Sequence, residues 1–274
     1  MSFPILQKYL ARLSDATGAA SSIWLDHEGK AQGRFFNCTM SSAFQPIREL
    51  ASGKVQAYEG LARSVSAQDQ GLSLWKLLDH AASDDESIEL DRLCRMLHAI
   101  NFFRQAGEGG QDLYLNVHDR LLSAVSSNHG HAFRRILDAL ELPLERVVLQ
   151  LPAASPQQGW LLNYVSDNYR RNGFRFAVNV PSAREALHVL ERLRPDVFKL
   201  DARELHDGET LQTLLTRSAQ AGVAVVFKRL ESPQSLTVLR QLSESAGVPL
   251  LVQGYLLDEP RADLLDTEPR AVAA

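Results

Sequence analysis

Cysteine is scarce in this chain of 274 residues, which contains only Cys38 and Cys94. Two thiols are too few for a disulfide framework, and this low content is typical of proteins from reducing compartments. We therefore expect a cytoplasmic protein without structural disulfides.

Long apolar runs and an excess of basic charge are also missing. Residues Met1 to Leu10 lack the basic start and the apolar stretch of a secretory signal, and no window reaches the length needed to span a bilayer. The formal net charge is -4, so the composition gives no electrostatic reason to expect nucleic-acid binding. We expect neither a membrane span nor a nucleic-acid partner.

Familiar site motifs are absent too. There is no P-loop, Gly-x-Gly-x-x-Gly or Gly-x-Ser-x-Gly pattern. The eight histidines do not show metal-ligand spacing, and the nearest pair, His129 and His131, lies in a polar stretch that favours an exposed turn. No zinc site is expected.

What the chain does contain is an alternation of strand-like and helix-like segments. The apolar, strand-like runs are Val55–Leu61, Leu113–Val117, Val147–Leu151, Phe174–Val180, Val197–Leu200, Val223–Phe227 and Leu250–Val252. Helical periodicity lies between most of them, for example over 88–103, 183–193 and 211–221. This alternation predicts parallel strands joined by crossover helices and favours an α/β fold closed into a TIM-like (β/α)8 barrel. An open, doubly wound sheet would give the same alternation.

The two ends of the chain differ from this pattern. Residues 1–40 predict a short helix near Pro4–Leu13 and a hairpin over Ser21–Gly33 with its turn at residues 26–29. This segment is too short to bury a core of its own, so we expect an N-terminal extension packed on the barrel. The barrel domain is assigned to residues 41–262, and residues 263–274 are expected to form a flexible tail.

Several expected strand ends carry motifs in a fixed order. The first are Phe44-Gln45-Pro46-Ile47 and Tyr58-Glu59-Gly60-Leu61-Ala62-Arg63. The later ones are Leu90-Asp91-Arg92, Leu115-Asn116-Val117, Pro195-Asp196-Val197-Phe198-Lys199-Leu200-Asp201, and Gln253-Gly254-Tyr255 with Pro260. Over roughly residues 43–262 they resemble the EAL family of cyclic-di-GMP phosphodiesterases, which implies an EAL-type barrel.

The resemblance also implies a two-metal site, and here this chain departs from the family. Glu59 and Asn116 match metal ligands, but Gln150 stands where the family has Glu, and Asn179-Val180 stands where it has a pair of Asp. The segment Lys228-Arg229-Leu230-Glu231 takes the place of Glu-Gly-Val-Glu. Only one of these acidic ligands remains, and two dications need several carboxylates to offset their charge. We expect remnants of a metal site, no bound metal, no cofactor and no catalysis.

The residues that would grip the nucleotide keep the family's type. In the family, matching positions bind cyclic-di-GMP; here they are Gln45, Leu61, Arg63, Asp91, Glu231, Gln253 and Pro260. Lys199 and Lys228 join this candidate set, because Lys228 would replace a metal cation in attracting phosphate.

Four of these residues also have a structural reading. Lys199 would pair with Glu59 or Glu231 inside the barrel, and Arg63 would pair with Glu59. Asp91 would be a solvated charge on an exposed helix, and Glu231 would pair with Arg229 or Lys228. Proline at positions 152 and 181 would reshape the loops and close the pocket.

Three functions follow from these alternatives. The first is a non-catalytic signalling protein that binds cyclic-di-GMP and relays it to a protein partner, with a homodimer as a further possibility. The second is a protein-interaction regulator that does not depend on nucleotide, for example of a transcription factor or a motility component. The third is a residual phosphodiesterase.

Overall fold

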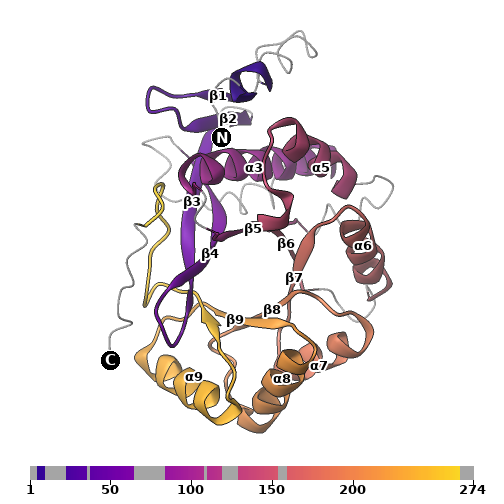
Figure 1. Cartoon of the computed structure of the whole chain (residues 1–274), viewed down its shortest axis with the longest axis vertical. Coiled ribbons are helices and arrows are strands. Elements are labelled where there is room, and N and C mark those ends of the chain that lie inside the picture. Colours follow the sequence, from indigo (N-terminus) through magenta and orange to yellow (C-terminus); the bar gives the residue numbers. More distant parts are fainter. Residues whose placement is uncertain are drawn as a thin grey trace.

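A barrel of eight strands forms the body of the protein (Figure 1). The computed structural model describes residues 5–9, 23–35, 38–64, 84–107, 110–118, 129–153 and 159–265. The barrel strands are β3 (Cys38–Glu49), β4 (Val55–Ser64), β5 (Asp112–Asn116), β6 (Val147–Leu151), β7 (Arg175–Asn179), β8 (Val197–Asp201), β9 (Ala224–Lys228) and β10 (Leu251–Val252). They pair in the order β3-β10-β9-β8-β7-β6-β5-β4, and β3 closes the ring by pairing with β4. The predicted barrel is confirmed.

One strand differs from the expected parallel pattern. β3 runs antiparallel to both of its neighbours, β4 and β10, and a turn whose Gly53 has φ 68° joins it to β4 without a helix. β3 was not among the strand-like runs, and its antiparallel pairing is an addition to the parallel pattern predicted for the others. The sequence Cys-Thr-Met-Ser-Ser-Ala-Phe-Gln-Pro-Ile-Arg-Glu also lacks the long apolar run by which the other strands were predicted.

The helices lie around the outside of the barrel (Figure 1). They are α3 (Asp84–Gln105), α5 (His129–Ala139), α6 (Gly159–Arg171), α7 (Ala183–Arg192), α8 (Gly208–Gln220) and α9 (Pro233–Ala246), with a short 3-10 turn η1 (Leu144–Arg146) before β6. His129 and His131 lie at the start of α5, so the exposed turn expected there is wrong. Among the helices the structure describes, none has the length and apolar character to cross a bilayer.

A hairpin of the N-terminal segment packs on the barrel. β1 (Ile23–Leu25) and β2 (Ala31–Phe35) form the expected hairpin, and β2 continues the sheet by pairing with the start of β3. Residues 5–9 are helical, while the rest of the predicted helix lies outside the described residues, as does the tail from 266 onward. The proposed boundary at residue 40 falls inside β3, so hairpin and barrel share one sheet.

A small polar cluster, here called the hairpin clasp, joins this hairpin to helix α3. It consists of Ser42, His98 and Asn101, all buried. Asn101 accepts from the N–H of Ala31 at 2.7 Å and donates to its carbonyl at 2.9 Å, while Ser42 Oγ lies 2.8 Å from His98 Nδ1. Burial lowers the pKa of His98 to about 3, so its ring is neutral. The clasp therefore satisfies the β2 backbone inside the core without burying a charge.

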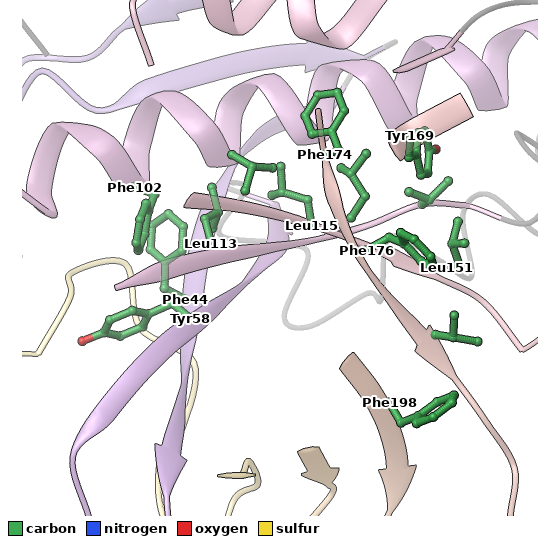
Figure 2. Packing of buried hydrophobic residues seen from close by; sticks show 14 of the residues in the cluster. Phe44, Tyr58, Phe102, Leu113, Leu115, Leu151, Tyr169, Phe174, Phe176 and Phe198 are labelled. Carbon is green, nitrogen blue, oxygen red and sulfur yellow. The ribbon is translucent and has the colours of Figure 1, made fainter. Parts of the chain in front are cut away.

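Two apolar layers hold the barrel together. The outer layer lies between strands and helices, where Phe44 and Tyr58 meet Phe102 of α3 at ring-centroid distances of 5.8 and 5.9 Å (Figure 2). Phe133 of α5 stacks on Phe174. The inner layer fills the barrel itself and consists of Ile47, Ala57, Tyr114, Val148, Ala177, Val197 and Val226, with Leu251 packed against it. The inner layer forms the floor beneath the candidate site.

Candidate functional site

A ring of polar side chains lies directly above the inner apolar layer, and each barrel strand contributes one member. These residues, here called the mouth ring, are Gln45, Glu59, Asn116, Gln150, Asn179, Lys199, Lys228 and Gln253. Each lies two residues from a member of the inner layer on the same strand, because alternate side chains of a strand share one face. Asn116, Asn179 and Lys228 are the last residues of β5, β7 and β9, so the ring lies on the side of the barrel where (β/α)8 barrels place their functional groups.

Lys199 is the centre of the ring's hydrogen-bond network. Its ammonium donates to three acceptors: Gln150 Oε1 at 2.5 Å, Glu59 Oε2 at 2.8 Å and Gln253 Oε1 at 3.0 Å. The same ammonium lies 5.7 Å from the centre of the Tyr114 ring below it. All three protons of this buried cation are therefore satisfied, as burial requires.

Glu59 is the matching anion of this network. Asn116 Nδ2 donates to its Oε1 at 2.7 Å, and Gln253 Nε2 donates to its Oε2 at 2.7 Å. Burial alone would raise the pKa of this carboxyl, but the charge of Lys199 and these hydrogen bonds outweigh it and lower the pKa to about 2. The interior pairing of Lys199 with Glu59 is confirmed. Within the described ranges Arg63 forms no ion pair with Glu59, contrary to the alternative for Arg63.

A second cation, Lys228, lies on β9, the strand next to the β8 strand that carries Lys199. Lys228 Nζ donates to Asn179 Oδ1 at 2.5 Å, and Asn179 Nδ2 donates to the carbonyl of Leu151 at 2.9 Å. Burial and the nearby charge of Lys199 lower the pKa of Lys228. Among the described residues no carboxylate forms an ion pair with this ammonium, so its charge faces the space above the ring.

That space is a cavity of about 630 Å³. The mouth ring forms its floor, and its walls add Leu61, Val117, His118, Pro152, Ala153, Arg229, Glu231, Gly254 and Tyr255. Pro152 lies in the wall, and the described residues do not fill the pocket, contrary to the alternative that proline would close it. Three cations and two carboxylates line the cavity, which gives a neutral to positive interior when Lys228 is protonated.

Arg229 at the rim has an unusual backbone conformation. Its φ is 57°, a left-handed value that costs a side-chain-bearing residue about 1 kcal/mol and favours glycine. The conformation is held from the next strand: Leu230 N–H donates to Gln253 O, Leu256 N–H donates to Leu230 O, and a Cβ on Gly254 would lie 2.2 Å from the Leu230 backbone. Contacts between the segments that follow β9 and β10 therefore fix the turn in which Arg229 lies.

Three predicted ligand residues do not line this cavity. Asp91 is buried, lies 2.6 Å from Arg95 in an ion pair, and accepts from the backbone N–H of His118 at 3.0 Å. It is not a solvated helix charge, so that alternative is wrong. Arg63 is exposed on β4. Pro260 lies two residues after Asp258, whose carboxylate pairs with buried Arg48 at 2.6 Å. A role for these three in ligand binding stays a prediction.

Sequence reasoning also missed parts of the wall. His118 directly follows the motif Leu115-Asn116-Val117, and Tyr255 ends the motif Gln253-Gly254-Tyr255, but neither was predicted to line the site. Arg229 was considered only as a partner for Glu231, and no ion pair forms between Glu231 and either Arg229 or Lys228 among the described residues. The sequence did mark Arg229 as unusual, because arginine stands there in place of the glycine of the Glu-Gly-Val-Glu motif.

A comparison with family models matches residues 29–260 to the EAL domain. The chain belongs to the EAL domain family. The match starts in the β1–β2 turn and reaches Pro260, so it covers the whole barrel and part of the hairpin. A comparison with curated proteins found no match.

Solved EAL structures have the same fold. The Klebsiella pneumoniae BlrP1 complex with manganese and cyclic-di-GMP at pH 9.0 is 22% identical, with a TM-score of 0.66 over 81% of this chain and 56% of that chain. The Bacillus subtilis YkuI complex with cyclic-di-GMP and calcium is 23% identical, with a TM-score of 0.67 over 83% and 56%. A standalone EAL protein from Vibrio cholerae O395, bound to cyclic-di-GMP, is 17% identical, with a TM-score of 0.65 over 86% and 98%. The chain thus spans just over half the length of the first two.

Proposed function

We propose that this EAL protein is a non-catalytic signalling module that binds cyclic-di-GMP without metal and relays it to a protein partner. The observation that carries the proposal is Lys228, an ammonium in the cavity at the position where the family motif has a metal-binding Glu. A cation fixed by the protein attracts phosphate at the place where a metal ion would otherwise do so.

The donor set of the mouth ring supports the absence of catalysis. Two-metal phosphodiester hydrolysis needs carboxylates that hold both ions and a water made acidic by them. The ring offers one carboxylate, Glu59, and that group already accepts from Lys199, Asn116 and Gln253. No group of three or more His, Cys, Asp or Glu side chains in the described ranges is placed to share a metal. These residues do not fit a two-metal centre.

The cavity supports binding of a nucleotide. Its volume of about 630 Å³ lies within the roughly 300–1,000 Å³ typical of small-molecule sites. Polar groups from all eight barrel strands converge on its floor, and its charge is neutral to positive. The three solved relatives described above are complexes with cyclic-di-GMP, which makes this dinucleotide the first ligand to test.

Calorimetry with cyclic-di-GMP in the presence of EDTA tests the proposal. We expect saturable binding that is unchanged by the chelator and weakened at least about tenfold in Lys228→Glu, since this variant reverses the charge facing phosphate. Lys228→Gln, which keeps a polar side chain opposite Asn179, is the matched variant. Absence of heat at high micromolar ligand would overturn nucleotide binding.

A parallel hydrolysis assay with Mg²⁺ or Mn²⁺ tests the loss of catalysis. We expect no linear dinucleotide above the buffer control. Turnover that disappears in Glu59→Gln would instead establish a residual phosphodiesterase.

A second candidate is a protein-interaction regulator that ignores the nucleotide. It is favoured by the burial of Asp91 in its pair with Arg95, which withdraws one expected nucleotide contact from the cavity. A partner captured equally well with and without cyclic-di-GMP, and equally by wild type and Lys228→Glu, would favour this function.

A further inference from the structure

At the cavity rim, two guanidinium groups and one carboxylate from neighbouring strand ends form a charged cluster. Asp201 at the end of β8 accepts from Arg203 through both oxygens, at 2.9 and 2.7 Å, and from the Arg203 backbone at 3.0 Å. Arg229 reaches the same carboxylate through one contact only, at 3.2 Å. One carboxylate is thus shared by two guanidinium groups.

The sharing is unequal. The two oxygens of Asp201 are already matched by the planar fork of Arg203, the geometry in which a guanidinium binds a carboxylate best. Hydrogen bonding from Arg203 is also the main reason why the pKa of Asp201 is lowered to about 2. Arg229 makes the longest of these contacts, and no other hydrogen bond from its guanidinium exists within the described ranges. Most of its donors therefore remain available.

Stability does not explain why an arginine stands at this position. Its side chain is 57% exposed, and an exposed single-contact ion pair contributes little in water. Its backbone is left-handed, a conformation that glycine adopts without strain and that the clamp on Leu230 enforces. A strained residue that lines a cavity and presents unused donors is typical of a ligand-contacting position.

The neighbouring residue, Lys228, supports a ligand contact at Arg229. Lys228 on the cavity floor and Arg229 on the rim are consecutive, and both line the same space. A cyclic dinucleotide carries two phosphates, so a floor cation and a rim cation from one strand end can serve one phosphate each.

We propose that Arg229 is a phosphate-binding residue of the cavity. In the free protein, Asp201 holds the Arg229 guanidinium by a single contact, while Arg203 pairs with the same carboxylate. This inference rests on the proposed function, since the phosphate belongs to cyclic-di-GMP. On binding, Arg229 exchanges its single contact with Asp201 for a forked contact with phosphate, while Arg203 keeps the Asp201 carboxylate neutralised. No covalent step is involved.

The decisive variant is Arg229→Gly, because glycine relieves the left-handed strain. We expect a melting temperature equal to or above that of wild type, together with at least about a tenfold loss of cyclic-di-GMP affinity by calorimetry in EDTA. The dependence of affinity on salt should also become shallower, because one phosphate contact is lost. Arg229→Asn, whose side chain tolerates the same backbone region, is the second variant and should give the same loss.

The outcomes separate the two proposals. If wild type gives no heat, the proposed function fails and this inference fails with it. If wild type binds and both variants bind equally tightly, only the role of Arg229 is overturned.

A further pair of variants tests whether Asp201 holds Arg229 in the free protein. Arg203→Ala should weaken binding severalfold, because Asp201 is then free to hold Arg229, and the loss should vanish in an Asp201→Asn background. Equal affinity of Arg203→Ala and wild type would overturn that part.

Discussion

The mouth ring and the hairpin clasp are both clusters of buried polar side chains, yet they differ in charge and in what they face. The clasp is neutral, closed and directed at backbone groups of β2. The ring contains two ammonium groups and one carboxylate, and it faces a cavity. The difference teaches that burial of polar groups alone does not identify a site. An uncompensated charge next to accessible space does.

The largest expected effect comes from breaking the ion pair in the ring. Lys199→Met leaves the Glu59 carboxylate buried without its cation, which should lower the free energy of unfolding by about 3–5 kcal/mol. Urea denaturation of Lys199→Met and of the double variant Lys199→Met/Glu59→Gln measures this. The double variant should recover much of the loss, and failure to recover any would show that the pair is not the cause.

The clasp should respond in stability but not in binding. Asn101→Ala leaves the N–H of Ala31 without its Asn101 acceptor and leaves its carbonyl with the long 3.4 Å contact from Ser41 Oγ, so we expect a loss of about 3 kcal/mol in the free energy of unfolding. Calorimetry below the melting temperature should show unchanged nucleotide affinity. A large loss of affinity would contradict the division between clasp and ring.

Acid should weaken the ring through Glu59. Its pKa is about 2 in the folded protein, against an ordinary value of 4.5, so the unfolded chain binds its proton first as the pH falls. The stabilisation is present above the ordinary pKa and is lost towards the folded pKa, by about 2 kcal/mol from about pH 5 to about pH 3. Urea denaturation at several pH values should show that the free energy of unfolding falls less steeply with falling pH in Glu59→Gln than in wild type. An equal pH dependence in both proteins would contradict the assignment to Glu59.

The smallest effect on stability is expected at Lys228. Its pKa is lowered, which means that the folded protein disfavours the charged form, and Lys228→Gln retains a polar group opposite Asn179. The free energy of unfolding should stay within about 0.5 kcal/mol of wild type or rise, by the range typical of substitutions that break no buried contact. Nucleotide affinity should fall in the same variant. A loss of stability with unchanged affinity would show that Lys228 has a structural role, like the clasp residues, and not a binding role.

Much of the barrel was predictable because seven of its strands are apolar runs between helices, as in Val147–Leu151. β3 escaped this rule, since Pro46 and its polar neighbours do not read as a strand; only its pairing with β4 and β10 shows its place. The ring residues were predictable from motif order. The burial of Asp91 was not, because its partner Arg95 lies one helical turn away in an ordinary sequence pattern. The clasp left a signal that was overlooked: His98 and Asn101 stand on the apolar side of α3.

The separation of the inner apolar layer from the mouth ring has a consequence for how this protein can change. Each strand presents one ring residue above its own apolar neighbour, so a ring position can be rewritten with the packing beneath it left intact. Paired ring residues such as Lys199 and Glu59 must change together, because either alone leaves a buried charge unpaired. Ligand preference can therefore change through the ring while Ile47, Val148 and Val226 keep the packing beneath it.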